Sequence, residues 1–191
     1  MMRFTSSRFS AGAALQPERY HVTARWMHWT MGGLVAGAVS TILYKQSLPK
    51  DDPGIGAVMW WHKSCGVTVA MLLPLRIALF FATKRPGMIP GSGVITHTIG
   101  TAAHYALYAF LVAMAFTGVG MGYASGRNIP FWFTEIETGP YYANPANAKW
   151  HYGWHVWVGY YGKFLIPVHA AGAVTHHARG QAIFTRMNPF A

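Results

Sequence analysis

Four long apolar runs constrain the fold of this chain more than any other feature of its sequence. They extend over residues 26–44, 59–82, 99–123 and 154–174. Each has close to the roughly 20 residues that a helix needs to cross a ~30 Å hydrocarbon layer. None alternates polar and apolar residues, as the strands of a membrane barrel do. A lipid-spanning segment must satisfy its backbone hydrogen bonds internally, and the sequence therefore predicts an all-α membrane protein, a bundle of four transmembrane helices.

The composition supports a membrane protein over a soluble one. Of the 191 residues, 52% are hydrophobic and only 10% are charged, whereas about a quarter are charged in soluble domains. The net charge of +10 would suggest nucleic acid for a soluble protein. In an apolar chain, that charge is better explained as cations left on one side of a membrane. We therefore expect the lipid bilayer, and no nucleic acid, as a partner.

The charged residues also predict the orientation in the membrane. Four spans place both termini on one side, and Glu18 is the only acid expected there. The loops expected on the other side hold the remaining acids, Asp51, Asp52, Glu135 and Glu137. Cationic residues favour the cytoplasmic side of a membrane. Both termini are therefore expected in the cytoplasm of a bacterium, with the chain in the plasma membrane, or in the matrix of a mitochondrion, with the chain in the inner membrane.

The N-terminal tail, residues 1–24, is basic and has two interpretations. Its first 17 residues contain Arg3, Arg8 and three serines but no acid, a composition that resembles a mitochondrial targeting segment. The alternative is a tail that is retained and packs against a partner.

The ten histidines are the most informative residues of the spans. Ionisable side chains within lipid are costly and usually face the bundle interior with a partner. His155 and His169 are fourteen residues apart in one span, which puts them about 40° apart around a helix and about 21 Å apart along it. His169 is then level with His28 at the inner end, and His155 with His62 at the outer end. The spacing predicts two pairs of facing imidazoles at two depths.

Two facing imidazoles at one depth are what a flat tetrapyrrole needs on its two faces. The single cysteine, Cys65, excludes a Cys-x-x-Cys attachment site, so the haem would be non-covalent and of type b. Zinc would prefer three or four ligands at one depth, often with Cys or an acid. The alternative for each histidine is a hydrogen bond to a carbonyl or a place at the interface.

Neighbouring polar residues have open roles. Arg76, fourteen residues after His62, is expected at the inner depth, either paired with haem propionates or extended to the interface. His104 is interpreted as a hydrogen-bond donor, a quinone contact or, less favoured, a rival inner ligand. His151 shares a helix face with His155 and competes with it as the outer ligand. Lys163 is expected either to contact a propionate or a quinone, or to extend between the helices to the interface.

Together these residues resemble the bacterial-type cytochrome b561 family. The resemblance covers about residues 25–187, flanked by the N-terminal tail and by residues 188–191. The matching pieces are Arg25-Trp-Met-His28-Trp29, His62-Lys-Ser-Cys-Gly66, Ala103-His104-Tyr-Ala-Leu-Tyr108 leading to Thr117-Gly118, His151-x-x-x-His155, Val168-His169-Ala-Ala and His176-His177.

The resemblance implies a four-helix protein with two haem b groups, which exchanges electrons with the quinone pool or a respiratory partner. His28 and His169 would hold the inner haem, and His62 and His155 the outer one. Some members of the family are similar to superoxide:quinone oxidoreductases, so a quinone-linked enzyme of that type is one expectation. A haem-bearing accessory or anchor subunit of a larger respiratory assembly, without its own substrate turnover, is the alternative. A metal transporter is a third. Other respiratory membrane proteins or a second copy are the expected partners.

Overall fold

The computed structural model describes residues 18–190, and most of them are helical. The interpretations of residues 1–17 lie outside the described residues. The elements are α1 (Val22–Ser47), α2 (Ile55–Ala82), α3 (Val94–Ala124), β1 (Ile129–Phe131), β2 (Thr134–Ile136), the 3₁₀ turn η1 (Pro140–Tyr142), α4 (Pro145–Gly162), α5 (Leu165–Ala178) and α6 (Ile183–Met187).

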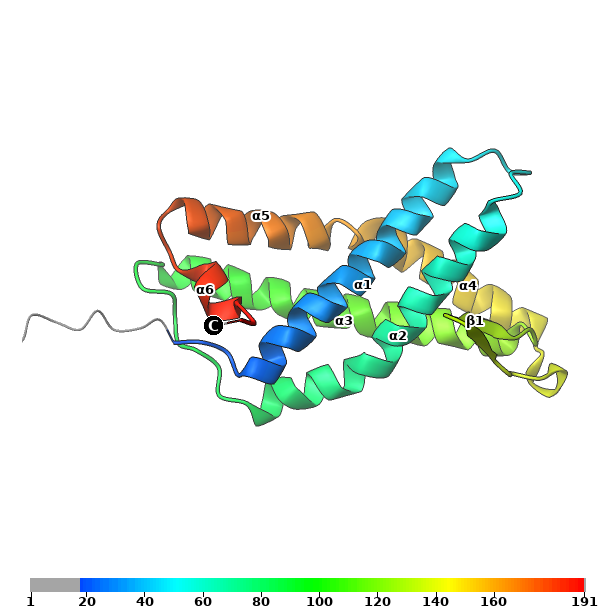
Figure 1. Ribbon diagram of the computed structural model, residues 1–191, viewed down its shortest axis with the longest axis horizontal. Helices are drawn as coiled ribbons and strands as arrows, with labels where there is room; N and C mark the ends of the chain where they lie inside the picture. The colour runs from blue at the N-terminus through cyan, green and yellow to red at the C-terminus, as the bar shows by residue number, and fades with distance from the viewer. Residues whose placement is uncertain (1–17, 191) are drawn as a thin grey trace, which may run out of the picture.

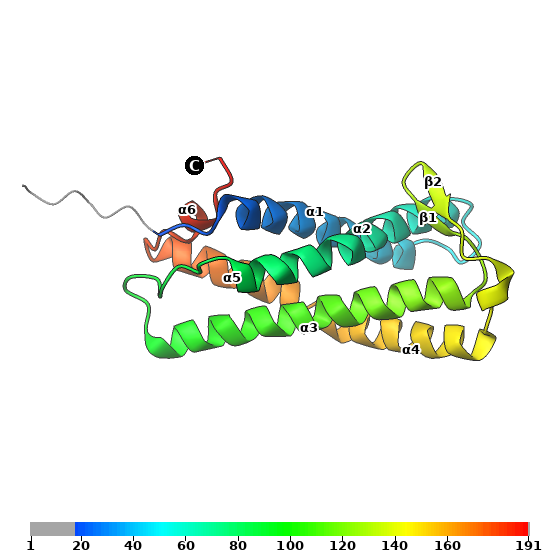
Figure 2. The ribbon, with the colours of Figure 1, turned by 90° about the horizontal axis from the view of Figure 1, so that it is seen from below.

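The helices are arranged as two antiparallel pairs. The most extensive packing joins α1 to α2 and α3 to α4, and α2 packs less extensively on α3. Figure 2 shows α1 and α2 in one layer and α3 with α4 in the other. The start of α1 and the helix α6 lie at the same end of the bundle, opposite the β1–β2 hairpin (Figure 1). We call these the inner and the outer end.

The last apolar run forms two helices and not the single uninterrupted helix that its length suggested. α4 ends at Gly162 and α5 begins at Leu165. Pro167 has no amide hydrogen, and its ring clashes with the carbonyl four residues earlier, that of Lys163. The amide of Lys163 still donates to the Gly159 carbonyl (3.2 Å) and that of Val168 to the Phe164 carbonyl (3.3 Å). The chain is therefore kinked but keeps its direction.

Two of the described helices, α2 and α3, have the length and apolar composition to cross a membrane. Only 22% of the most apolar stretch of α2 and 11% of that of α3 is buried, which suits helices that face lipid. The helices α1, α4 and α5 do not meet the same criteria. α5 is too short, and α1 and α4 are rich in Gly, His, Trp and Tyr, which are less apolar than the residues of α2 and α3. The four-span topology therefore stays a prediction for these helices.

A small apolar core holds the two layers together. Met31 of α1 and Val69 and Leu73 of α2 are buried, and Tyr108 and Leu111 of α3 pack against them. The apolar surfaces of these side chains are removed from contact with water or lipid. Their close packing holds the two layers in place. In sequence, this core lies between the two levels at which the paired histidines are expected.

The loop between α3 and α4 contains a hairpin that the sequence did not predict. β1 and β2 pair antiparallel, with Ile129 opposite Ile136. Trp132 at the turn has a φ of 52°, an uncommon value for a side-chain-bearing residue. Its amide donates to Ser64 Oγ (2.8 Å) and its indole to Thr68 Oγ1 (2.8 Å). These two bonds fasten the hairpin to the outer half of α2.

The C-terminal residues close the inner end. Arg186 is buried, and its guanidinium donates to the carbonyls of Gly87 (2.7 Å) and Met88 (3.2 Å). The indole of Trp29 donates to the Met187 carbonyl (2.8 Å), and Arg25 donates to the carbonyl of Asn188. α6 is therefore joined both to α1 and to the segment that follows α2.

Candidate functional site

The structure brings together the two histidine pairs that the spacing predicts. The imidazole centroids of His28 and His169 lie 6.0 Å apart, and those of His62 and His155 lie 6.3 Å apart. The four rings come from α1, α5, α2 and α4 in that order. Each pair therefore joins the two layers of the bundle.

These centroid distances suit two imidazoles on opposite sides of one metal ion. An imidazole nitrogen binds a transition metal at about 2 Å, and it lies about 1 Å from its ring centroid, so that two axial rings have centroids roughly 6 Å apart. A direct N–H···N bond of about 3 Å would bring the centroids to roughly 5 Å. No hydrogen bond joins either pair among residues 18–190.

The hydrogen bonds of the outer pair, His62 and His155, engage both Nδ1 atoms and leave both Nε2 atoms available to bind a metal. His62 Nδ1 lies 2.9 Å from the Ala38 carbonyl, which only accepts, so Nδ1 carries the proton. His155 Nδ1 lies 3.0 Å from Thr117 Oγ1, and that hydroxyl donates to the Ala113 carbonyl (2.6 Å). Its oxygen therefore accepts from His155. Both Nε2 atoms keep a free lone pair, which is the arrangement found for metal-ligating histidines.

Gly118 of α3 positions His155. A Cβ at this glycine would lie 3.0 Å from Cε1 of His155 and 3.3 Å from its Nδ1. The missing side chain lets the ring lie directly against α3, within reach of Thr117. The contact of Gly118 across the α3–α4 interface is therefore with a ring and not with the backbone of α4.

The inner pair has a different neighbour. Arg76 Nη2 lies 3.1 Å from His28 Nδ1, and a guanidinium has only donors. Nδ1 of His28 therefore accepts this bond. A ring that binds metal through Nε2 has its proton on Nδ1, and Arg76 would then turn to another acceptor. A carboxylate is the preferred acceptor for a guanidinium, so these residues fit a group that brings its own carboxylates.

His104 lies beside the inner pair. Its ring centroid is 5.0 Å from that of His169, and its Nδ1 donates to the Gly100 carbonyl of the same helix (2.6 Å). The roles of donor, quinone contact and rival ligand all remain compatible with this position.

Two further candidates do not join a pair. His151 contacts Phe116 and Trp150, with centroids 5.3 and 5.0 Å away, instead of His62. Lys163 Nζ lies over the ring of Tyr160 (4.8 Å) and near that of Phe164 (5.3 Å). Both of those rings are exposed. Lys163 therefore lies on the exposed side of the kink between α4 and α5 and not in the bundle interior.

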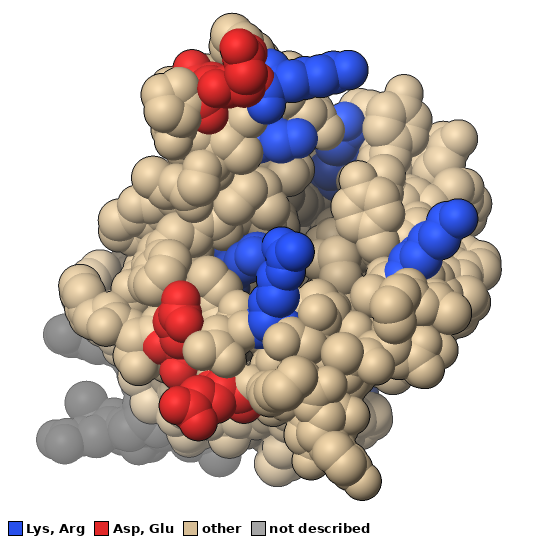
Figure 3. All heavy atoms as spheres, turned by 90° about the vertical axis from the view of Figure 1, so that its right-hand side faces the viewer, with Lys and Arg blue, Asp and Glu red and all other residues tan. Residues whose placement is uncertain are grey.

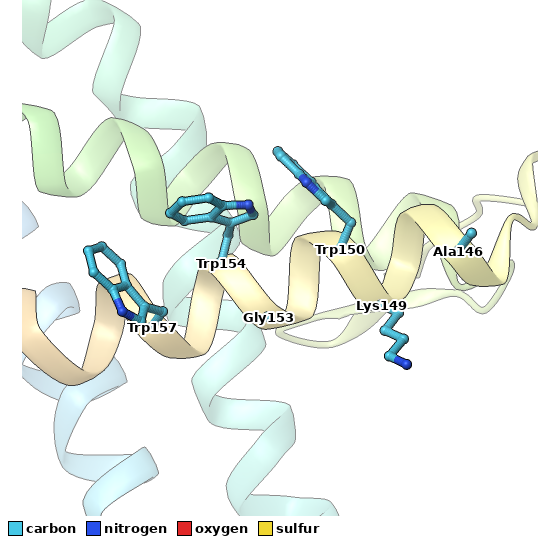
Figure 4. A pocket seen from close by; sticks show the side chains of 6 residues that line it. All are labelled: Ala146, Lys149, Trp150, Gly153, Trp154 and Trp157. Atoms are coloured by element: carbon cyan, nitrogen blue, oxygen red, sulfur yellow. The ribbon is translucent and has the colours of Figure 1, made fainter.

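A shallow groove of about 590 Å³ lies on α4 and is lined by none of the four paired histidines. In Figure 4, the rings of Trp150, Trp154 and Trp157 stand along the helix, and Lys149 points to the other side. Exposed indoles of this kind settle at the headgroup level of a membrane. We assign this face to lipid contact and not to the chemistry of the imidazoles.

Sequence reasoning missed the residues that orient the outer ligands. Ala38 acts through its backbone carbonyl, for which a sequence carries no signal. Thr117 lies one position before Gly118 within a quoted motif, but its hydroxyl had no role assigned. Among residues 18–190, no three or more His, Cys, Asp or Glu side chains form a group that could hold a metal ion by themselves; the imidazoles occur in pairs.

Comparison with known proteins identifies the family. The family model described as prokaryotic cytochrome b561 matches residues 19–189. Cytochrome b561 homolog 2 of Escherichia coli (strain K12) is 28% identical over 167 residues, which cover 84% of this chain and 86% of the relative. The probable superoxide oxidase CybB of Yersinia pestis is 24% identical over 163 residues, covering 84% and 89%. This chain belongs to the prokaryotic cytochrome b561 family, membrane proteins that bind haem b and transfer electrons.

Proposed function

We propose that this protein holds two haem b groups and carries electrons across a membrane between them, exchanging them with a quinone. The observation that carries the proposal is the presence of two imidazole pairs, with centroids 6.0 and 6.3 Å apart. A haem with two axial imidazoles cycles between ferric and ferrous iron. Two such groups at two depths make a path across the bilayer.

The residues of the outer site would hold a haem there and tune its potential. His62 and His155 offer their Nε2 lone pairs, and the Ala38 carbonyl and Thr117 hydroxyl fix the tautomers of both rings. Accepting the Nδ1 proton makes an imidazole a stronger electron donor to a metal. These contacts would therefore favour the ferric state of a haem held there and would lower its reduction potential.

At the inner site, Arg76 would compensate the negative charge of the haem propionates. Its guanidinium lies between His28 and the ring of Tyr108, 5.7 Å from the ring centroid. No acid occurs in any of the predicted spans, so the haem propionates are the carboxylates that Arg76 would meet there. His104 is the neighbouring group that is placed to exchange a hydrogen bond with a haem edge or a quinone carbonyl.

The name of one relative, a probable superoxide oxidase, favours superoxide as an electron donor. Two superoxide anions each lose one electron and become O₂, and these electrons with two protons reduce one quinone to the quinol. The outer end is a mixed surface, with cationic and acidic side chains both present (Figure 3). Steering of an anion by net charge would therefore be weak, and the donor must be identified by assay.

The haem content of the purified protein tests the proposal. We expect two non-covalent haem b groups per chain and a dithionite-reduced spectrum with two b-type components. One haem per chain would contradict the proposal. The anchor alternative is tested separately: a purified chain that reduces quinone with superoxide unaided is an enzyme, whereas one with two haems and no turnover without partners is a subunit.

A further inference from the structure

His151 is a histidine of the outer half of α4 for which the proposed electron path has no use. It lies four residues before His155, which places it about 6 Å further toward the outer end on nearly the same helix face. Its Nδ1 is buried and has no hydrogen-bond partner among residues 18–190. Buried polar side-chain atoms have a partner in the large majority of cases, so this atom indicates a partner of another kind.

The surroundings of His151 hold the ring in place. A Cβ at Gly120 would lie 2.4 Å from Cε1 of His151 and 2.7 Å from each ring nitrogen. Phe116 and Trp150 contact the ring edge-on. These neighbours offer no acceptor, because Gly120 presents only helix backbone and the two aromatic rings present apolar surface. The ring is thus fixed, one turn above an axial ligand, in an apolar cage.

We propose that His151 donates a hydrogen bond to a propionate of the haem held by His62 and His155. This inference rests on the proposed function. A haem carries two carboxylates at its edge, and the chain has no acid in its spans to meet an imidazole there. A carboxylate accepts strongly from an imidazole N–H in a low-dielectric site. His151 is then a positioning residue for the outer haem, and not a third axial ligand.

The bond has an electrostatic consequence for the outer haem only. A propionate without a donor keeps its full negative charge near the iron, and this stabilises the ferric state. Removing the donor therefore lowers the midpoint potential of the outer haem. The inner haem, bound at the other level, is the internal control.

Redox titration of the purified, fully loaded protein tests the inference. His151→Leu removes the donor, His151→Asn keeps an amide N–H near the position of Nδ1, and His97→Leu, at the exposed start of α3, is the matched control. The component that is lost in His62→Ala identifies the outer haem. We expect His151→Leu to keep both haems and to favour the ferric outer haem by about threefold, or about 28 mV at 59 mV per decade. His151→Asn should shift less, and His97→Leu not at all.

Redox-difference infrared spectra give a second readout. The carboxylate bands that change on reduction should move in His151→Leu and stay in place in His97→Leu. Loss of the outer haem in His151→Leu and His151→Asn alike would make His151 a ligand and overturn the inference. So would an unchanged outer midpoint potential with unchanged carboxylate bands. Both outcomes are distinct from failure of the proposed function, in which the wild-type chain itself would lack two haems.

Discussion

The imidazoles of His62 and His155 face each other across the two layers of the bundle, with centroids 6.3 Å apart and ring planes at 84°. Each ring is held from behind by an acceptor on a further helix, the Ala38 carbonyl on α1 and the Thr117 hydroxyl on α3. The outer pair therefore involves all four long helical segments. A ligand between the two rings would link the two layers. The layers also meet in the apolar core around Met31, Val69 and Leu73.

Replacing either member of a pair should remove one haem and spare the other. In His62→Ala, the outer site keeps a single imidazole, which is insufficient for a six-coordinate haem, whereas His28 and His169 are untouched. We expect about half of the wild-type haem per chain and loss of one b-type spectral component. His169→Ala should remove the other component. Loss of both haems from a protein that is still folded would contradict two independent sites.

The Thr117 hydroxyl should strengthen haem binding at the outer site. Thr117→Val removes the acceptor for the Nδ1 proton of His155, and loss of such an outer contact typically weakens metal binding by about 10- to 100-fold. We expect faster haem transfer from the outer site to apomyoglobin, with normal retention in Thr117→Ser. Thr41→Val is the matched control, because the Thr41 hydroxyl bonds only to carbonyls of its own helix. Equal retention in Thr117→Val and wild type would argue against this role.

The pairing of the histidines could be predicted from the sequence because helical spacing survives the kink at Lys163. The fourteen residues from His155 to His169 cross the break before Pro167, yet both rings meet the expected partners. The backbone bonds to the carbonyls of Gly159 and Phe164 continue the chain in one direction. Pro167 explains the break, since it removes a helical hydrogen bond, but a proline alone does not predict one, because α2 continues as one helix through Pro74.

Other features depend on contacts that one-dimensional patterns do not contain. The acceptor for His62 is a backbone carbonyl, and any residue at position 38 would supply one. The β1–β2 hairpin rests on Trp132 in a left-handed conformation that few residues other than Gly, Asn and Asp adopt. Its bonds to Ser64 and Thr68 join segments that are far apart in the sequence. The number of spans and the charges predicted that this loop would lie on the side opposite the termini, but not that it would fold back on α2.

Two glycines of α4 should respond oppositely to alanine. A Cβ at Gly162 would lie 2.2 Å from Cδ2 of Phe110, a buried ring, whereas a Cβ at Gly153 would meet no atom within 4 Å. Gly162→Ala should therefore destabilise the fold by about 1–3 kcal/mol through overpacking. Gly153→Ala should stabilise it by roughly 0.5–1 kcal/mol through the lower chain entropy of alanine. Thermal unfolding in detergent, followed by circular dichroism, measures both; a shift of the same sign in the two variants would refute the assignment of Gly162 to the α3–α4 contact.

Glu18 should make the inner end sensitive to acid. Its carboxylate accepts from the Gly87 amide (2.9 Å) and lies 3.8 Å from Lys84 Nζ. The hydrogen bond from Gly87 and the charge of Lys84 lower the pKa of Glu18 below its usual value. A lowered folded-state pKa contributes stability above the unfolded pKa of about 4.3, and this contribution is lost as the pH falls through the folded-state value. We therefore expect the segment 83–93 to be better protected from hydrogen exchange in wild type than in Glu18→Gln at pH 7, with the difference shrinking as the pH falls below the unfolded pKa and vanishing below the folded-state pKa. Comparing the two proteins at each pH cancels the intrinsic pH dependence of exchange.

Glu137→Gln, at a carboxylate without a hydrogen bond or ion pair among residues 18–190, is the control. A difference that is constant from pH 7 to pH 3 would show that the carboxylate charge is not what orders this segment.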